Sequence, residues 1–61
     1  MKDWIIFVTP KDKVQAIENQ HLGKGIQEKA LMKAGHRVIG HIAAKKKEGA
    51  IEYGEQVLWK D

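Results

Sequence analysis

The sequence WIIFVTPKDKVQAI, residues 4–17, decides how the fold begins. Its first five residues are all aromatic or β-branched apolar residues, which is typical of a short strand, and Thr9 and Pro10 end the run. Successive side chains of a strand point to opposite faces, so this run needs cover on both faces. We therefore expect residues 4–8 to form a strand that is central in its sheet or lies at a subunit interface.

The residues that follow allow two interpretations. In the first, Thr9 caps a helix, Pro10 takes its first position and Asp12 lies near the positive end of the helix dipole. Later apolar positions recur at helical spacing: Val14, Ile17 and His21 or Leu22. In the second interpretation the chain continues as an extended segment through KVQAI, residues 13–17. The helix is the expected structure, with the extended segment as its alternative.

A second helix is expected over residues 26–34. Gly23 and Gly25 indicate a break before it, because each glycine in a helix interior costs about 1 kcal/mol relative to alanine. Gly35 ends it, since glycine tolerates the left-handed conformation found just past a helix. The expected inward stripe comprises Ile26, Ala30, Leu31 and Ala34, and the expected outward side chains are Gln27, Glu28, Lys29 and Lys33.

From Arg37 the apolar period changes to two, which predicts a β-hairpin that reverses at KKKEG, residues 45–49. The first strand would place Val38, Gly40, Ile42 and Ala44 on one face, and the second would place Ile51, Tyr53, Val57 and Trp59 on one face. The whole chain, residues 1–61, then reads as a single small α+β domain of order β-α-α-β-β. We expect a three-stranded, mainly antiparallel sheet with the helical segment on one face.

The length and composition limit the class of protein. A chain of 61 residues buries only about 60% of its unfolded surface, so its core is small. It has no cysteine, which excludes disulfides and thiolate metal sites. Only five consecutive apolar residues occur near the start, fewer than a signal peptide or a membrane span needs. We expect a cytoplasmic protein with no membrane partner.

Catalytic chemistry has little support in the sequence. There is no serine, and the only threonine, Thr9, already has an expected structural role. The three histidines form no HxxxH or HExxH pattern, and His36 and His41 are an odd number of positions apart near one strand. Glu48, Glu52 and Glu55 are expected to be a solvated rim. We therefore predict no enzymatic activity, no metal and no cofactor.

The charge is unevenly distributed along the chain. The net charge is +3, but residues 24–47 hold seven basic side chains and one acidic side chain, a net of +6. The last fourteen residues carry a net charge of −3. Such an asymmetry can steer an anionic partner, and it can equally be complementary between two copies of the chain.

Two segments are candidate anion sites. In LGKGIQEK, residues 22–29, Lys24 and the amides of Gly25 and Ile26 could hold an anion, although a tight helix–helix connection is the favoured interpretation because the pattern is no phosphate loop. The lysine run is either a solvated turn or part of a basic surface that contacts phosphates. That surface would comprise Lys45, Lys46, Lys47, Arg37, Lys33 and Lys29.

Two functions follow from these features. The leading hypothesis is a small regulatory module, and a homodimer, that contacts nucleic-acid backbone through this basic surface. The alternative is a protein-interaction module that docks a partner on an apolar sheet face, with Trp4 or Trp59 at the interface.

Overall fold

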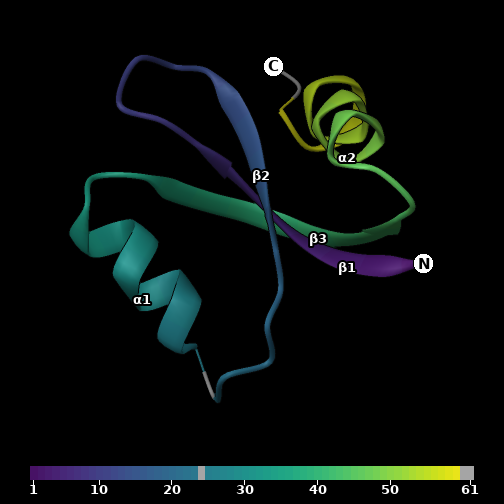
Figure 1. The fold of residues 1–61 in the computed structure, drawn as a ribbon. Helices are drawn as coiled ribbons and strands as arrows, with labels where there is room; N and C mark the ends of the chain where they lie inside the picture. Colours follow the sequence, from purple (N-terminus) through teal and green to yellow (C-terminus); the bar gives the residue numbers. More distant parts are fainter. Residues whose placement is uncertain (24, 60–61) are drawn as a thin grey trace.

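The strand at residues 4–8 is the centre of the fold. The structure, a computed structural model, describes residues 1–23 and 25–59. Its elements are the strands β1 (Lys2–Val8), β2 (Val14–Glu18) and β3 (Arg37–Ala44), the helices α1 (Ile26–Lys33) and α2 (Lys47–Tyr53), and a π-helical segment, η1 (Gly54–Leu58), that continues α2 (Figure 1). The strands form one antiparallel sheet in the order β2-β1-β3. The α+β class, the three-stranded antiparallel sheet and the central position of the first strand are confirmed.

The expected helix after Pro10 is wrong, and the extended alternative is confirmed. The Asp12 backbone N–H donates to the Thr9 carbonyl at 2.9 Å, which makes residues 9–12 a β-turn with Pro10 at the position that proline favours. The chain then returns as β2, in which Val14 pairs with Val8 and Ala16 pairs with Ile6. The same Thr-Pro pattern suits a turn and a helix start, and the burial of Val14 and Ala16 in the core decides between them.

The expected second strand of the C-terminal hairpin is also wrong, because residues 47–58 are helical. Ala50 and Gly54 are buried four residues apart, and Leu58 is half-buried a further four residues on, so one helix face meets the sheet. Tyr53 and Val57, which the strand interpretation placed on the apolar face, are exposed. The lysine run is therefore a strand-to-helix connection, and β3 pairs with β1 instead of with the C-terminal segment.

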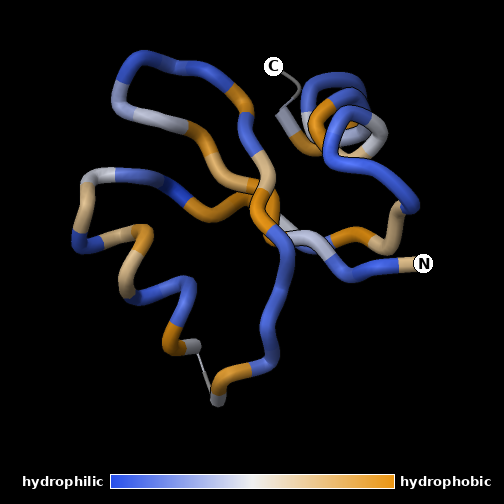
Figure 2. The backbone as a smooth tube through the Cα atoms, viewed as in Figure 1, coloured by the Kyte–Doolittle hydropathy of each residue, from blue (hydrophilic) through white to orange (hydrophobic). Residues whose placement is uncertain are grey.

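Each face of the sheet carries one helix, which differs from the expectation that one face holds both. The face that holds Trp4, Ile6 and Val8 packs against Ala50 of α2, and this is the main hydrophobic core. The other face holds Ile5, which is paired in register with His41, and His41 contacts Glu28 of α1. Figure 1 shows α1 and α2 on opposite sides of the strands, and Figure 2 shows hydrophobic residues gathered where the strands pass one another.

The side of α1 that faces the sheet matches the predicted apolar stripe only at Leu31. Gln27, Glu28 and Leu31 are half-buried, whereas Ile26 and Ala30 are exposed. Hydrogen bonds explain this orientation. The Gln27 side chain donates to the Glu18 carbonyl at 3.0 Å and accepts from the Gln20 N–H at 2.8 Å. Polar contacts to the sheet and its loop therefore fix the rotation of α1, and no residue of this helix is fully buried.

The junction of α2 and η1 comes closest to the sheet at Gly54. A Cβ atom built there would lie 2.6 Å from Ile6 Cγ2 and 2.9 Å from Val14 Cγ1, and both of these side chains are buried. The φ of Gly54 is −59°, so an alanine would fit the backbone and only the contact would oppose it. Gly54 is thus the residue that lets the helix rest on the sheet.

We predict that Gly54→Ala lowers the free energy of unfolding by about 1–3 kcal/mol, as overpacking of a close contact does. The matched control is Gly49→Ala on α2, where a Cβ atom would meet nothing within 4 Å. This control should raise the free energy of unfolding by up to about 1 kcal/mol, because alanine has the higher helix propensity. Urea unfolding followed by circular dichroism measures both. Equal effects of the two substitutions would contradict the close contact.

Candidate nucleic-acid interface

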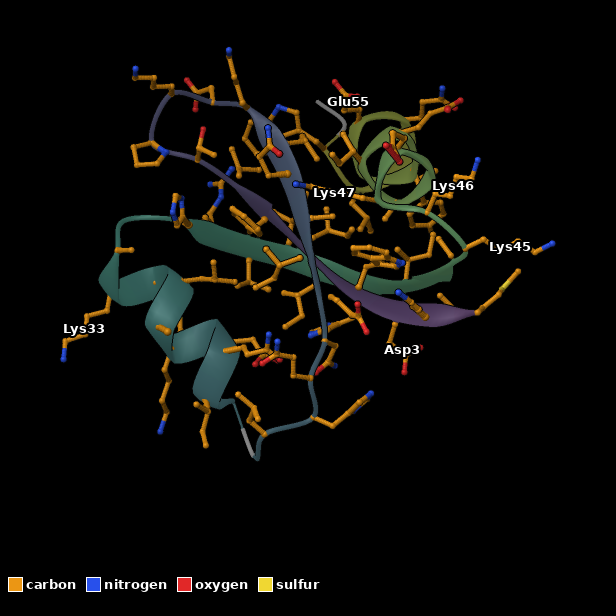
Figure 3. The ribbon with its side chains drawn as sticks, in the orientation of Figure 1. Asp3, Lys33, Lys45, Lys46, Lys47 and Glu55 are labelled. Atoms are coloured by element: carbon orange, nitrogen blue, oxygen red, sulfur yellow. The ribbon has the colours of Figure 1, made fainter. Side chains whose placement is uncertain are left out.

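The lysine run lies where β3 ends and α2 begins. Lys45 and Lys46 form the connection, Lys47 is the first residue of α2, and all three are exposed. Lys46 is the N-cap residue, with extended backbone angles and no capping hydrogen bond from its side chain. Figure 3 shows Lys45 pointing away from the body of the protein. The three lysines are consecutive in the chain and exposed, but Figure 3 shows Lys47 extending from α2 toward β2, so its side chain points in a different direction from that of Lys45.

None of these lysines is paired with a carboxylate among the described residues. The ion pairs within residues 1–23 and 25–59 lie elsewhere: Lys2 with Glu18 at 3.5 Å, His21 with Asp3 at 3.2 Å, and His41 with Glu28 at 3.0 Å. The run also lies at the positive end of the α2 dipole, where cations are unfavourable, and Glu48 in the first turn offsets only part of this. Residues 45–48 together carry a net charge of +2, from three lysines and Glu48.

Arg37 lies at the other end of β3 from the lysine run. Eight residue steps of about 3.3 Å each place it roughly 26 Å along the strand from Lys45. Its guanidinium carbon is 4.8 Å from the centre of the Trp59 ring, a cation–π contact. Arg37 therefore joins the start of β3 to the end of η1, and it does not extend the lysine run.

The lysines of α1 form a third, separate group. Lys29 and Lys33 are exposed on the helix that covers the opposite face of the sheet from α2. Figure 3 shows Lys33 on the far side of the molecule from Lys45. The basic surface expected from the sequence is thus divided among the lysine run, Arg37 and α1.

The second candidate anion site is a connection between β2 and α1. Lys24 lies outside the described residues. Gly25 is the N-cap of α1 with a left-handed φ of 71°, and Ile26 begins the helix with its side chain exposed. Because the segment joins a strand to a helix, the expected helix–helix connection is corrected. Gly25 here serves the backbone turn.

The two tryptophans differ in exposure. Trp4 is 8% exposed, and its Nε1 donates to the Ala44 carbonyl at 2.9 Å, so it is a core residue and is no free anchor for a partner. Trp59 is half-buried, packs against the core, and its ring contacts Arg37. Phe7 is buried beside His36, with the two ring centres 5.0 Å apart. Trp4, Trp59 and Phe7 therefore make their contacts within the chain.

Sequence reasoning missed the polar contact between α1 and β3. The His41 ring nitrogen Nε2 lies 3.0 Å from Glu28 Oε2. A hydrogen bond from its own backbone N–H, and next that from His41, lowers the pKa of Glu28 from its ordinary value. Helical periodicity had placed Glu28 on the solvent side, so no pattern in the sequence indicated this pair.

Two other kinds of site are absent from the described residues. These residues enclose no pocket, and they hold no cluster of three or more histidine and carboxylate side chains that fits a metal ion. Over the same residues, every helix is too short or too polar to cross a membrane.

Comparison of the chain with protein-family models, with curated proteins and with solved structures found no match.

We predict that Glu28→Gln reduces the dependence of stability on pH. The pKa of Glu28 is lower in the folded protein, so its stabilising effect is present above its unfolded pKa and is lost as the pH falls through its folded pKa. Between about pH 6 and pH 3, the wild type should lose more stability than Glu28→Gln. Urea unfolding at several pH values within this range measures the difference.

The control for this experiment is Glu55→Gln, which removes the same charge from an exposed position with no hydrogen bond or ion pair to any described residue. This variant should keep the wild-type profile. If wild type and Glu28→Gln lose stability in parallel, the hydrogen bonds that the Glu28 carboxylate accepts from its own backbone N–H and from His41 do not contribute to the pH dependence of stability.

Proposed function

We propose that this chain is a small, non-enzymatic module that binds nucleic-acid backbone through Lys45, Lys46 and Lys47. The observation that carries the proposal is the group of three exposed ammonium groups with no carboxylate partner among the described residues. Phosphates are the natural partners of such a group, because each contact releases condensed counterions from the nucleic acid.

The surroundings of the lysine run support contact with backbone instead of with bases. The segment AAKKKEGA, residues 43–50, contains no asparagine or glutamine, which read adenine, and no arginine, so lysine is its only side chain that commonly contacts guanine. The lysine ammonium is a compact point charge that binds phosphate without needing a fixed orientation. Two alanines precede the lysines and the exposed Glu48 follows them, so the one acidic side chain of the segment lies at one end of the run. The expected binding is therefore strong at low salt and insensitive to nucleotide sequence.

Arg37, Lys29 and Lys33 have a secondary place in this proposal. Arg37 contacts Trp59 at the opposite end of β3 from the run, and Lys29 and Lys33 belong to α1, on the other side of the strands from α2. A short oligonucleotide on the run would therefore not reach them at the same time. A longer nucleic acid that follows the surface could meet them in turn. Substitution of Lys29 and Lys33 should then weaken the binding of long nucleic acids more than that of short oligonucleotides.

We predict that Lys45→Gln/Lys47→Gln weakens binding to mixed-sequence oligonucleotides by about tenfold or more at about 50 mM salt. The slope of log affinity against log salt should decrease by about two, because two phosphate contacts are lost. Fluorescence anisotropy between about 50 and 200 mM salt measures both quantities.

The matched control is Lys11→Gln/Lys13→Gln, which removes two exposed lysines of the same spacing from the β1–β2 turn. It should retain the wild-type salt slope. A wild type that binds no oligonucleotide at low salt, or equal effects of the two double variants, would contradict the proposal.

The alternative function, docking of a protein on an apolar sheet face, needs a surface other than the one expected. Each face of the sheet already carries a helix, and Trp4 is buried. The large apolar side chains that remain exposed lie mainly on and beside the helices: Leu22, Ile26, Met32, Tyr53 and Val57.

A further inference from the structure

The outer side of α1 combines apolar side chains with lysines. Ile26 and Met32 are each more than half exposed. Ile26, Lys29 and Lys33 recur at i, i+3 and i+7, so they lie on one face of the helix, and Met32 lies beside Lys29. We call these four residues the α1 surface. It carries two positive charges next to two apolar groups.

Beyond Lys46 and Lys47 at its start, the outer side of α2 and η1 combines exposed apolar side chains with acidic side chains. Glu48 and Glu52 are exposed one helical turn apart. Tyr53 and Val57 are exposed on the other flank of the same outer side, with Gln56 between the two pairs. The Gln56 side chain donates to Glu52 at 3.2 Å, which continues the polar row along the helix. We call Glu48, Glu52, Tyr53 and Val57 the α2 surface.

We infer that the α1 surface of one copy of this chain docks on the α2 surface of a second copy. The two surfaces match in charge and in spacing, because the lysine pair and the glutamate pair are each four residues apart, about 6 Å along a helix. Within one copy, each like-charged pair repels itself at i, i+4, and pairing with the other surface relieves this repulsion. The same contact also buries the exposed apolar side chains near each charged pair, which removes their surface from water.

The arrangement of the two surfaces determines the form of the assembly. They lie on opposite faces of the sheet, so one copy cannot offer both surfaces to the same partner. The contact is head-to-tail and leaves a free surface at each end, unlike the closed homodimer expected from the sequence. Because α1 is only about 12 Å long, the contact is smaller than a stable interface of about 1,200 Å². Association is therefore weak and sensitive to salt.

Charge exchange between the two surfaces tests the inference. The acidic variant is Lys29→Glu/Lys33→Glu, and the basic variant is Glu48→Lys/Glu52→Lys. Each variant has two surfaces of the same sign, so neither should associate with itself. An equimolar mixture should associate, because each surface of one variant then meets a surface of opposite sign on the other.

Sedimentation velocity without nucleic acid, from about 10 μM to about 1 mM protein, measures the mass. The wild type should rise above 6.9 kDa with concentration at low salt, each variant alone should stay at the monomer mass, and the mixture should rise again. Lys11→Glu/Lys13→Glu carries the same charge change as the acidic variant on another surface, and it should still associate.

Three results would overturn the inference: a wild type that stays monomeric throughout, association that both variants retain, or a mixture that stays monomeric. A monomeric wild type would mean that the α1 surface and the α2 surface do not bind each other. Thermal unfolding of each variant shows that the exposed substitutions leave the fold intact. All of these variants keep Lys45, Lys46 and Lys47, so the result does not depend on nucleic-acid binding.

Discussion

The burial of β1 on both faces is the constraint on which the rest of the structure depends. Ile5 and Ile6 are adjacent in the chain, point to opposite faces and are both fully inaccessible to solvent. A strand with this pattern must have a neighbour at each edge and a layer over each face. The chain meets the first need with β2 and β3, and it meets the second with one helix per face. With so few residues, each requirement uses a whole element.

The sequence predicted an element correctly where its local pattern and its contacts in the folded protein favour the same structure. The two-sided apolar run at residues 4–8 indicated a central strand, the glycines around residues 26–34 marked a helix, and the period of two from Arg37 marked β3. The predicted helix within residues 9–22 and the predicted strand within residues 50–59 were wrong, because the local pattern of each segment is compatible with either a helix or a strand. In both, contact with β1 decides the outcome: Val14 enters the core as part of a strand, and Gly54 lets a helix approach Ile6.

The candidate site was predictable only as far as it is local in the chain. Three consecutive lysines stay adjacent along the backbone in any fold, and the structure shows them exposed, with Lys45 and Lys47 pointing in different directions. The position of Arg37 depended on the length and direction of β3, which separates it from the run. The rotation of α1 could not be predicted from helical periodicity, because the hydrogen bonds of Gln27 and the contact of Glu28 with His41 fix it. These polar contacts turn Ile26 outward and with it the lysines of α1.

Because the chain is small, some apolar side chains stay exposed, and the charges around them determine which of these surfaces can meet in the proposed contact. A larger core would cover Ile26 and Val57, but the described residues of this chain leave both more than half exposed. Two copies that met through identical surfaces would bring lysine to lysine or glutamate to glutamate, which opposes contact. Only the unlike surfaces attract each other. Each charged row therefore opposes contact between identical surfaces and favours the proposed contact between the α1 surface and the α2 surface. In that contact, the charge pattern selects which apolar surfaces meet.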